Sequence, residues 1–154
     1  MEDVFQKLIL MIRAYYPVLY LHSYEYYRTK QKIKGIVELL RREGKKVNYY
    51  QWDCVYGLVQ ILPDKTEIRI ERMQNPLEVL AYILNSKKSG EKNIFVLDDI
   101  NNHIERDEVK LMFRKIAEAT NNNTHAIILS SIYRLPAELE KYITVLQICL
   151  LYTS

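Results

Sequence analysis

The chain has 154 residues, 49% apolar and 27% charged, which is enough for one compact domain with a sizeable core. Its formal net charge of +3 permits an acidic partner but is far below that of dedicated nucleic-acid binders. Cys54 and Cys149 stand alone without CxxC spacing, so we expect a reducing compartment and ordinary buried thiols, with no disulfide or zinc framework. No apolar run approaches the roughly 18 residues that span a bilayer, and the expected location is the cytoplasm.

The predicted elements alternate between helix and strand. Apolar residues either recur at the i, i+3, i+4 spacing of one helical face or form the short apolar runs typical of buried strands. In chain order, the pattern predicts a helix at Val4–Tyr15, a strand at Tyr16–Ser23, a helix at Arg28–Glu43, a strand at 46–54, an antiparallel hairpin at 58–70, a helix at 75–86, a strand at 93–99, a helix at Asp107–Thr120, a strand at 125–131, a helical turn at 136–142 and a last strand at 143–150. Such alternation requires crossover connections, so we expect a three-layer α/β fold with a mainly parallel sheet.

Polar residues follow three of the predicted strands. Ligands of parallel α/β sheets bind beyond the carboxyl ends of the strands. At these ends the chain carries His22 and Ser23, Asp98 and Asp99, and Ser130 and Ser131. We therefore expect these side chains to gather at one rim of the sheet.

The stretch "IFVLDDI" (94–100) is typical of a Walker-B strand. In that interpretation Asp98 would hold magnesium through water, and Asp99 would polarise the attacking water. Glutamate is usual at the second position, and aspartate is one methylene too short to reach that water. The alternative is that both aspartates simply end a strand and cap the following turn.

A phosphate-binding P-loop is absent from its expected place. The motif GxxxxGK[ST] needs glycines because the backbone N–H groups must turn inward around the phosphates. Directly after the first strand the chain reads "HSYEYYRTK", without glycine, and Thr29 and Lys30 stand in the reverse of the motif's order. We therefore expect no ATP hydrolysis by this chain and no cofactor bound within it.

Several segments together resemble a known family. They are "RAYYPVLYLHSYEYYRTKQKI", "YYQWDCVYGLV", "NIFVLDDINNHI" and, most specifically, "AIILSSIYRLPAELEKYITVL". They are similar to the N-terminal region of a little-characterised group of AAA+ ATPases from cyanobacteria, other bacteria, phages and a conserved reading frame of algal chloroplasts. In that group an ATPase-like domain without a working P-loop precedes a complete AAA+ domain. The resemblance runs from about Val4 to Gln147, which implies that residues 1–148 form one degenerate AAA+-like ATPase domain.

The resemblance implies a P-loop-NTPase-like sheet of order 5-1-4-3-2, with the hairpin as an antiparallel addition. In this order the "AIILSS" strand lies between the first strand and the acidic strand. By position, Asp98 and Asp99 match a degenerate Walker-B end and Ser131 matches the sensor position, so these three are the expected remnants of a nucleotide site. No residue matches an arginine finger.

The function that the resemblance implies is that of a non-catalytic module. The module would regulate or dock on a downstream AAA+ domain of the same gene, which would carry ATP and Mg²⁺. A homo-oligomer could form through that domain, and no membrane is involved. The implied location is the cytoplasm of a bacterial or phage-infected cell, or the plastid stroma in an alga.

Two other functions remain open. The basic helix 28–46, with tyrosines nearby, would suit a nucleic-acid-binding module, although its charges spread around the helix instead of forming a stripe. A weak ATP-binding domain would use Asp98 with a non-standard phosphate loop. The tyrosines between Tyr15 and Tyr27 are expected to pack at the core and rim with hydroxyls reaching water, and Trp52 is expected in the core.

The last six residues, "CLLYTS" (149–154), break the pattern of the final strand. They resemble the start of a translated sequencing adapter, so we expect a non-native or truncated tail and an incomplete gene product. The alternative is a natural strand that runs two residues longer and then frays.

Overall fold

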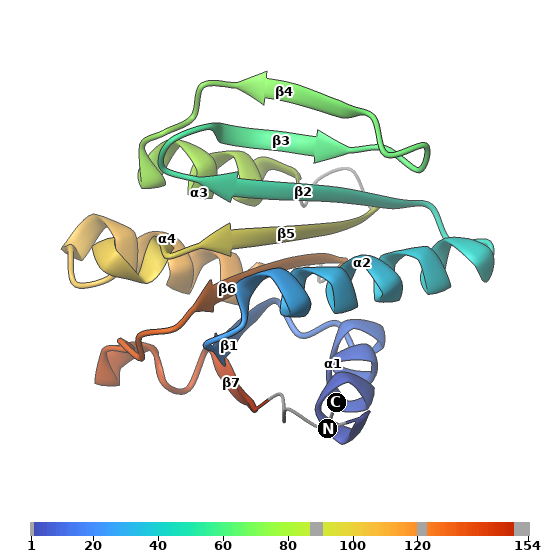
Figure 1. Cartoon of the computed structure of the whole chain (residues 1–154). Helices are drawn as coiled ribbons and strands as arrows, with labels where there is room; N and C mark the ends of the chain where they lie inside the picture. Colours follow the sequence, from blue (N-terminus) through green and yellow to red (C-terminus); the bar gives the residue numbers. More distant parts are fainter. Residues whose placement is uncertain (1, 87–90, 120–122, 150–154) are drawn as a thin grey trace.

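The computed structural model describes residues 2–86, 91–119 and 123–149 (Figure 1). In this part of the chain the elements are α1 (Glu2–Arg13), β1 (Val18–Ser23), α2 (Tyr26–Arg42), β2 (Val47–Asp53), β3 (Gly57–Ile61), β4 (Glu67–Glu71), α3 (Pro76–Ser86), β5 (Lys92–Asp98), the 3₁₀ turn η2 (Ile100–His103), α4 (Asp107–Glu118), β6 (Thr124–Ser130), the 3₁₀ turn η3 (Ala137–Leu139) and β7 (Thr144–Ile148). Every predicted element is present, with its ends displaced by a few residues. The predicted non-native tail lies outside the described residues, except for Cys149.

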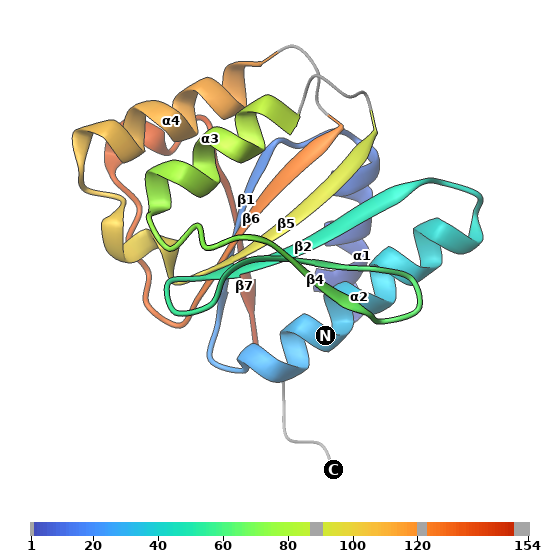
Figure 2. The same cartoon turned by 90° about the horizontal axis from the view of Figure 1, so that it is seen from above.

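The sheet is covered by helices on both faces, which confirms the expected three-layer α/β fold. Helices α1 and α2 lie on one face, and α3 and α4 lie on the other (Figures 1 and 2). Alternate side chains of a strand point to opposite faces. In β6, Ile127 and Leu129 pack with α1 and α2, whereas Ala126 and Ile128 pack with α3 and α4. Among the described residues, no helix combines the length and apolarity needed to cross a membrane.

The sheet is mixed and has seven strands in the order β4-β3-β2-β5-β6-β1-β7. Strand β6 pairs with both β1 and β5 in parallel, so it lies between them as the resemblance implied. The expected order 5-1-4-3-2 counted the five parallel strands, which lie as β7-β1-β6-β5-β2, and the hairpin brings the sheet to seven strands. Strands β3 and β4 extend the sheet beyond β2 as an antiparallel pair, with β3 bonded to the outer edge of β2.

The burial predicted for Trp52 is confirmed, whereas the burial predicted for the two cysteines is wrong. Trp52 is only 2% exposed, and its Nε1–H donates to the Met73 carbonyl, so the predicted core position is confirmed. Cys54 and Cys149 are exposed, so the prediction of buried thiols is wrong. Cys54 lies in the turn between β2 and β3, and Cys149 follows the end of β7, where packing ends.

Candidate functional site at the carboxyl edge of the sheet

The carboxyl ends of three neighbouring strands meet at one rim. Strands β5, β6 and β1 are adjacent and parallel, so their last residues lie side by side. Ser130 Oγ donates to Asp99 Oδ1 at 2.9 Å, and His22 Nε2 lies 3.0 Å from the Ser131 carbonyl oxygen. The structure therefore brings together the polar groups that the sequence placed at these strand ends.

Asp99 joins three elements through its side chain and backbone. Its φ of 57° is left-handed, a conformation that aspartate tolerates better than most residues. Its Oδ1 accepts hydrogen bonds from Tyr26 of α2 at 2.5 Å and from Ser130 of β6 at 2.9 Å. Tyr26 Oη in turn accepts from the Ser131 N–H at 3.1 Å. The predicted capping role is wrong for Asp99, because its side chain makes no capping bond to η2.

Asp98 forms an ion pair with Lys30 of α2. The two side chains are 16% and 23% exposed, respectively. Asp98 Oδ2 is the acceptor, while Oδ1 is buried and has no hydrogen-bond partner in the described part of the chain. Burial raises the pKa of Asp98 above its ordinary value, the Lys30 ammonium opposes this shift, and the charges of Asp53 and Asp99 add to it. Asp98 is thus a buried carboxylate whose charge an ammonium group balances.

A phosphate loop would lie in the turn between β1 and α2. In this chain, side chains of that turn are hydrogen-bonded to one another and to its backbone. Ser23 and Thr29 are fully buried and hydrogen-bonded to each other at 2.9 Å. Ser23 Oγ also accepts the Glu25 N–H at 3.1 Å. Glu25 occupies the N-cap position of α2. A carboxylate therefore stands at the helix end that would attract a phosphate, and these residues do not fit a triphosphate.

Sequence reasoning did not identify the roles of Tyr26 and Lys30. The two residues are four apart on α2, so they lie on one side of the helix. Their bonds to Asp99 and Asp98 show that this side faces the strand ends. This spacing was the signal that could have identified Tyr26 and Lys30.

The tyrosine prediction is wrong in part. Tyr20 is fully buried, so its hydroxyl does not reach water, and the hydroxyls of Tyr20 and Tyr26 both bond to protein groups. Tyr20 Oη donates to the Ile132 carbonyl at 2.6 Å and accepts the Arg134 N–H at 2.9 Å, which fixes the chain after β6. Burial raises the pKa values of both tyrosines. Tyr24 and Tyr27 are 77% and 74% exposed and do face solvent.

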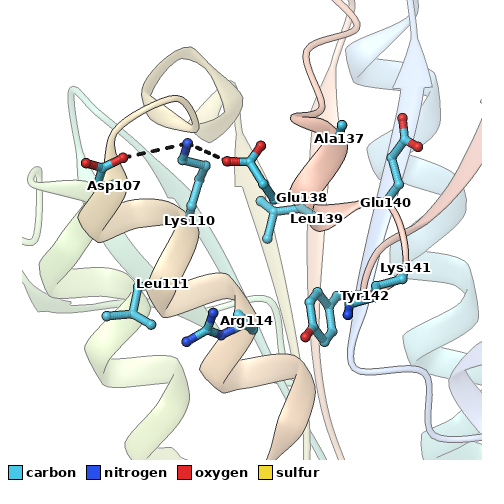
Figure 3. A pocket seen from close by; sticks show the side chains of 10 residues that line it. All are labelled: Asp107, Lys110, Leu111, Arg114, Ala137, Glu138, Leu139, Glu140, Lys141 and Tyr142. Carbon is cyan, nitrogen blue, oxygen red and sulfur yellow. Dashed lines mark hydrogen bonds and ion pairs between the residues drawn. The ribbon is translucent and has the colours of Figure 1, made fainter.

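A hollow of about 660 Å³ lies between α4 and the segment around η3 (Figure 3). It is lined by Asp107, Lys110, Leu111, Arg114, Ala137, Glu138, Leu139, Glu140, Lys141 and Tyr142. Lys110 bridges two carboxylates across its rim, Glu138 at 2.9 Å and Asp107 at 3.7 Å. One wall is the "AELEKY" segment, part of the stretch most specific to the resemblance. None of the three predicted nucleotide-site remnants lines it.

Comparison with known proteins gives consistent matches over nearly the whole chain. The family model of the SpoVK-like AAA ATPase N-terminal domain matches residues 4–148. An uncharacterized AAA domain-containing protein ycf46 from Trieres chinensis is 27% identical over 142 residues, which cover 92% of this chain and 27% of that protein. The ycf46 protein of Guillardia theta is 27% identical over 139 residues, covering 89% and 26%. The chain thus spans about a quarter of the length of these curated relatives.

Proposed function

The chain belongs to the family of SpoVK-like AAA ATPase N-terminal domains, and we propose that it is a non-catalytic module that regulates or docks on an AAA domain of the same protein. ATP and Mg²⁺ would bind in that AAA domain. This chain would retain the ATPase-like sheet as a rigid support but would not hydrolyse ATP.

The ion pair between Lys30 and Asp98 carries this proposal. A Walker-B aspartate acts by holding a metal ion, and here the carboxylate oxygen Oδ2 is already paired with an ammonium group from α2. Glu25 at the start of the same helix supplies negative charge where phosphate would bind. The protein's own side chains thus supply both charges that a bound Mg·ATP would bring.

A weak ATP-binding domain is the less favoured alternative. It would require Lys30 to leave Asp98, a buried carboxylate whose other oxygen has no partner in the described residues. Leaving a buried charge unpaired is strongly unfavourable. No compensating phosphate loop follows β1.

A nucleic-acid interface along the basic helix 28–46 is also less favoured. Several of its cations are engaged within the protein: Arg28 with Glu25 at 3.7 Å, Lys30 with Asp98, Arg41 Nη2 with the Val47 carbonyl at 2.9 Å, and Lys46 with Glu91 at 3.3 Å. Burial also lowers the pKa of Arg41, as expected for a guanidinium that faces the protein. Strong dependence of oligonucleotide binding on salt concentration would favour this alternative instead.

Two measurements with Mg·ATP test the absence of catalysis. An assay of phosphate release tests hydrolysis, and a calorimetric titration tests binding. We expect no phosphate release and no binding that depends on Asp98, so the chain and its Asp98→Asn variant should give the same titration. Saturable Mg·ATP binding that disappears in Asp98→Asn would overturn the proposal.

The proposed regulatory or docking role is tested on a longer gene product that includes an AAA domain. Its ATPase rate is compared with that of the same protein lacking residues 1–148. Regulatory coupling is typically worth a change of about fivefold or more. Equal rates together with an equal oligomeric state would contradict a regulatory or docking role.

A further inference from the structure

A second group of charged residues lies at the opposite, amino edge of the sheet. The strand arrows of β2 and β5 point away from this edge in Figure 1. A hollow of about 370 Å³ there is lined by Arg13, Tyr15, Lys45, Lys46, Glu91, Lys92 and Asn123. These residues come from the end of α1, the turn before β2 and the start of β5 and β6. Cations dominate the lining.

Lys92 is the buried cation of this group. It is 9% exposed, and its Nζ donates to the Ile12 carbonyl at 2.9 Å and lies 2.9 Å from His125 Nε2. His125 Nδ1 lies 2.6 Å from the Tyr16 carbonyl oxygen. A carbonyl only accepts, so Nδ1 carries the hydrogen and Nε2 accepts from the ammonium. Both hydrogen-bond partners of Lys92 are therefore neutral.

The positive charge of the hollow is only partly balanced. Two of its cations have carboxylate partners: Arg13 with Glu43 at 2.6 Å and Lys46 with Glu91 at 3.3 Å. In the part of the chain that the structure describes, neither Lys45 nor Lys92 has an ion pair. Burial, together with the charge of Lys45, lowers the pKa of Lys92 to about 8. A buried ammonium without a counter-ion is costly. The Tyr15 ring, whose centroid lies 5.2 Å from Lys92 Nζ, offsets part of this cost, and an anion in the hollow would offset more of it.

A structural role accounts for part of this arrangement. The bond from Lys92 to the Ile12 carbonyl satisfies the last turn of α1 and places a cation at the negative end of that helix. That role needs one lysine. It does not account for Lys45, which lies on the rim of the same hollow.

We propose that this hollow binds a phosphate group, either inorganic phosphate or the phosphate of a small phosphomonoester. Four cations facing two carboxylates match a dianion. Ammonium and guanidinium groups are the donors that phosphate oxygens accept best. The site lies at the other edge of the sheet from Asp98 and does not rest on the proposed function.

The test is a titration of the whole chain at pH 7 with inorganic phosphate and, separately, with AMP, followed by calorimetry and melting temperature. Sodium chloride at matched ionic strength is the reference. We expect saturable binding and a rise in melting temperature with both phosphates and none with chloride. AMP that binds more tightly than phosphate identifies a phosphomonoester as the ligand, and equal binding identifies the phosphate group alone.

Charge-matched variants locate the site. Lys45→Gln changes an exposed residue and should weaken phosphate binding by at least about tenfold, the loss expected for one charge-assisted hydrogen bond. Lys115→Gln, an exposed lysine of α4 outside the hollow, should leave binding unchanged, as should Asp98→Asn. A phosphate response equal to that of chloride, or one unaffected by Lys45→Gln, would overturn the site. Loss of phosphate binding in Asp98→Asn would place the anion at the carboxyl edge and would also overturn it.

Discussion

Two residues of α2 bind the carboxylates of the aspartates at the end of β5. Lys30 pairs with Asp98, and Tyr26 donates to Asp99 at 2.5 Å. Each carboxylate is thus held by a protein donor from the helix that follows β1. The aspartates contribute to the packing of α2 against the sheet, which is the role that their environment supports.

Removal of Lys30 is expected to cost more stability than removal of Asp98. Lys30→Met leaves a mostly buried carboxylate unpaired and should lower the free energy of unfolding by about 2 kcal/mol, less than for a fully buried pair because Lys30 is 23% exposed. Asp98→Asn loses the ion pair but removes a desolvated charge, so its effect should be no more than about 1 kcal/mol. Urea denaturation of both variants and of the double variant measures these values.

The double variant is the control for this pair. It should be more stable than Lys30→Met alone, and strictly additive losses would show that Lys30 and Asp98 are not coupled.

The pH dependence of the free energy of unfolding gives a second measurement on Asp98. Burial raises the pKa of Asp98 in the folded chain above the ordinary 3.8, so the folded chain binds this proton more tightly than the unfolded chain does. The resulting contribution to the free energy of unfolding is fully present below pH 3.8 and is lost as the pH rises through the raised pKa. Asp98→Asn should remove this loss.

At the scale of elements, the hairpin β3–β4 is held against β2 by a close approach at Gly57. Gly57 begins β3 with a φ of +78°. A Cβ at this position would lie 2.9 Å from the Met73 backbone nitrogen and 3.1 Å from the Glu71 carbonyl oxygen. The chain leaving β4 therefore crosses Gly57 directly, and the bond from Trp52 to the Met73 carbonyl fixes this crossing.

Alanine substitutions at two glycines should have opposite effects on stability. Gly57→Ala should destabilise by more than about 1 kcal/mol, because of its positive φ and the backbone contacts. Gly35 lies inside α2 with nothing within 4 Å of an added Cβ, so Gly35→Ala should stabilise by about 0.5–1 kcal/mol. The urea midpoints of the two variants decide this, and a midpoint for Gly57→Ala that is unchanged or raised would show that the crossing at Gly57 is not tight.

At the scale of the whole molecule, two apolar clusters share one sheet. One cluster packs α1 and α2 on one face, and the other packs α3 and α4 on the opposite face. The strands contribute alternate residues to each. If the sheet unfolds, the apolar residues of both clusters become exposed to water.

We therefore expect a single cooperative unfolding transition of the chain. Trp52, the only tryptophan, lies in the cluster of α3 and α4, so its fluorescence reports one face, whereas far-ultraviolet circular dichroism reports both. The two urea curves should superimpose. Separate midpoints would mean that the faces unfold independently.

The sequence alone determined the order of the elements and the position of the rim. The periods of the apolar residues fix which segments are helices and which are strands, and parallel strands necessarily bring their carboxyl ends together. The missing glycines after β1 could also be read directly, since a phosphate loop is a local motif. Family resemblance added the place of β6 between β1 and β5.

Only the tertiary structure decided which side chains meet. Lys30 and Asp98 are 68 residues apart, and Tyr26 and Asp99 are 73 apart. Their contacts depend on where α2 crosses the sheet, which the packing of its apolar face decides. The same holds for Lys92 and His125, 33 residues apart, whose neutral hydrogen bond arises only because β5 and β6 begin side by side. A local pattern specifies its own segment, whereas these contacts are set by the packing of distant segments against one another.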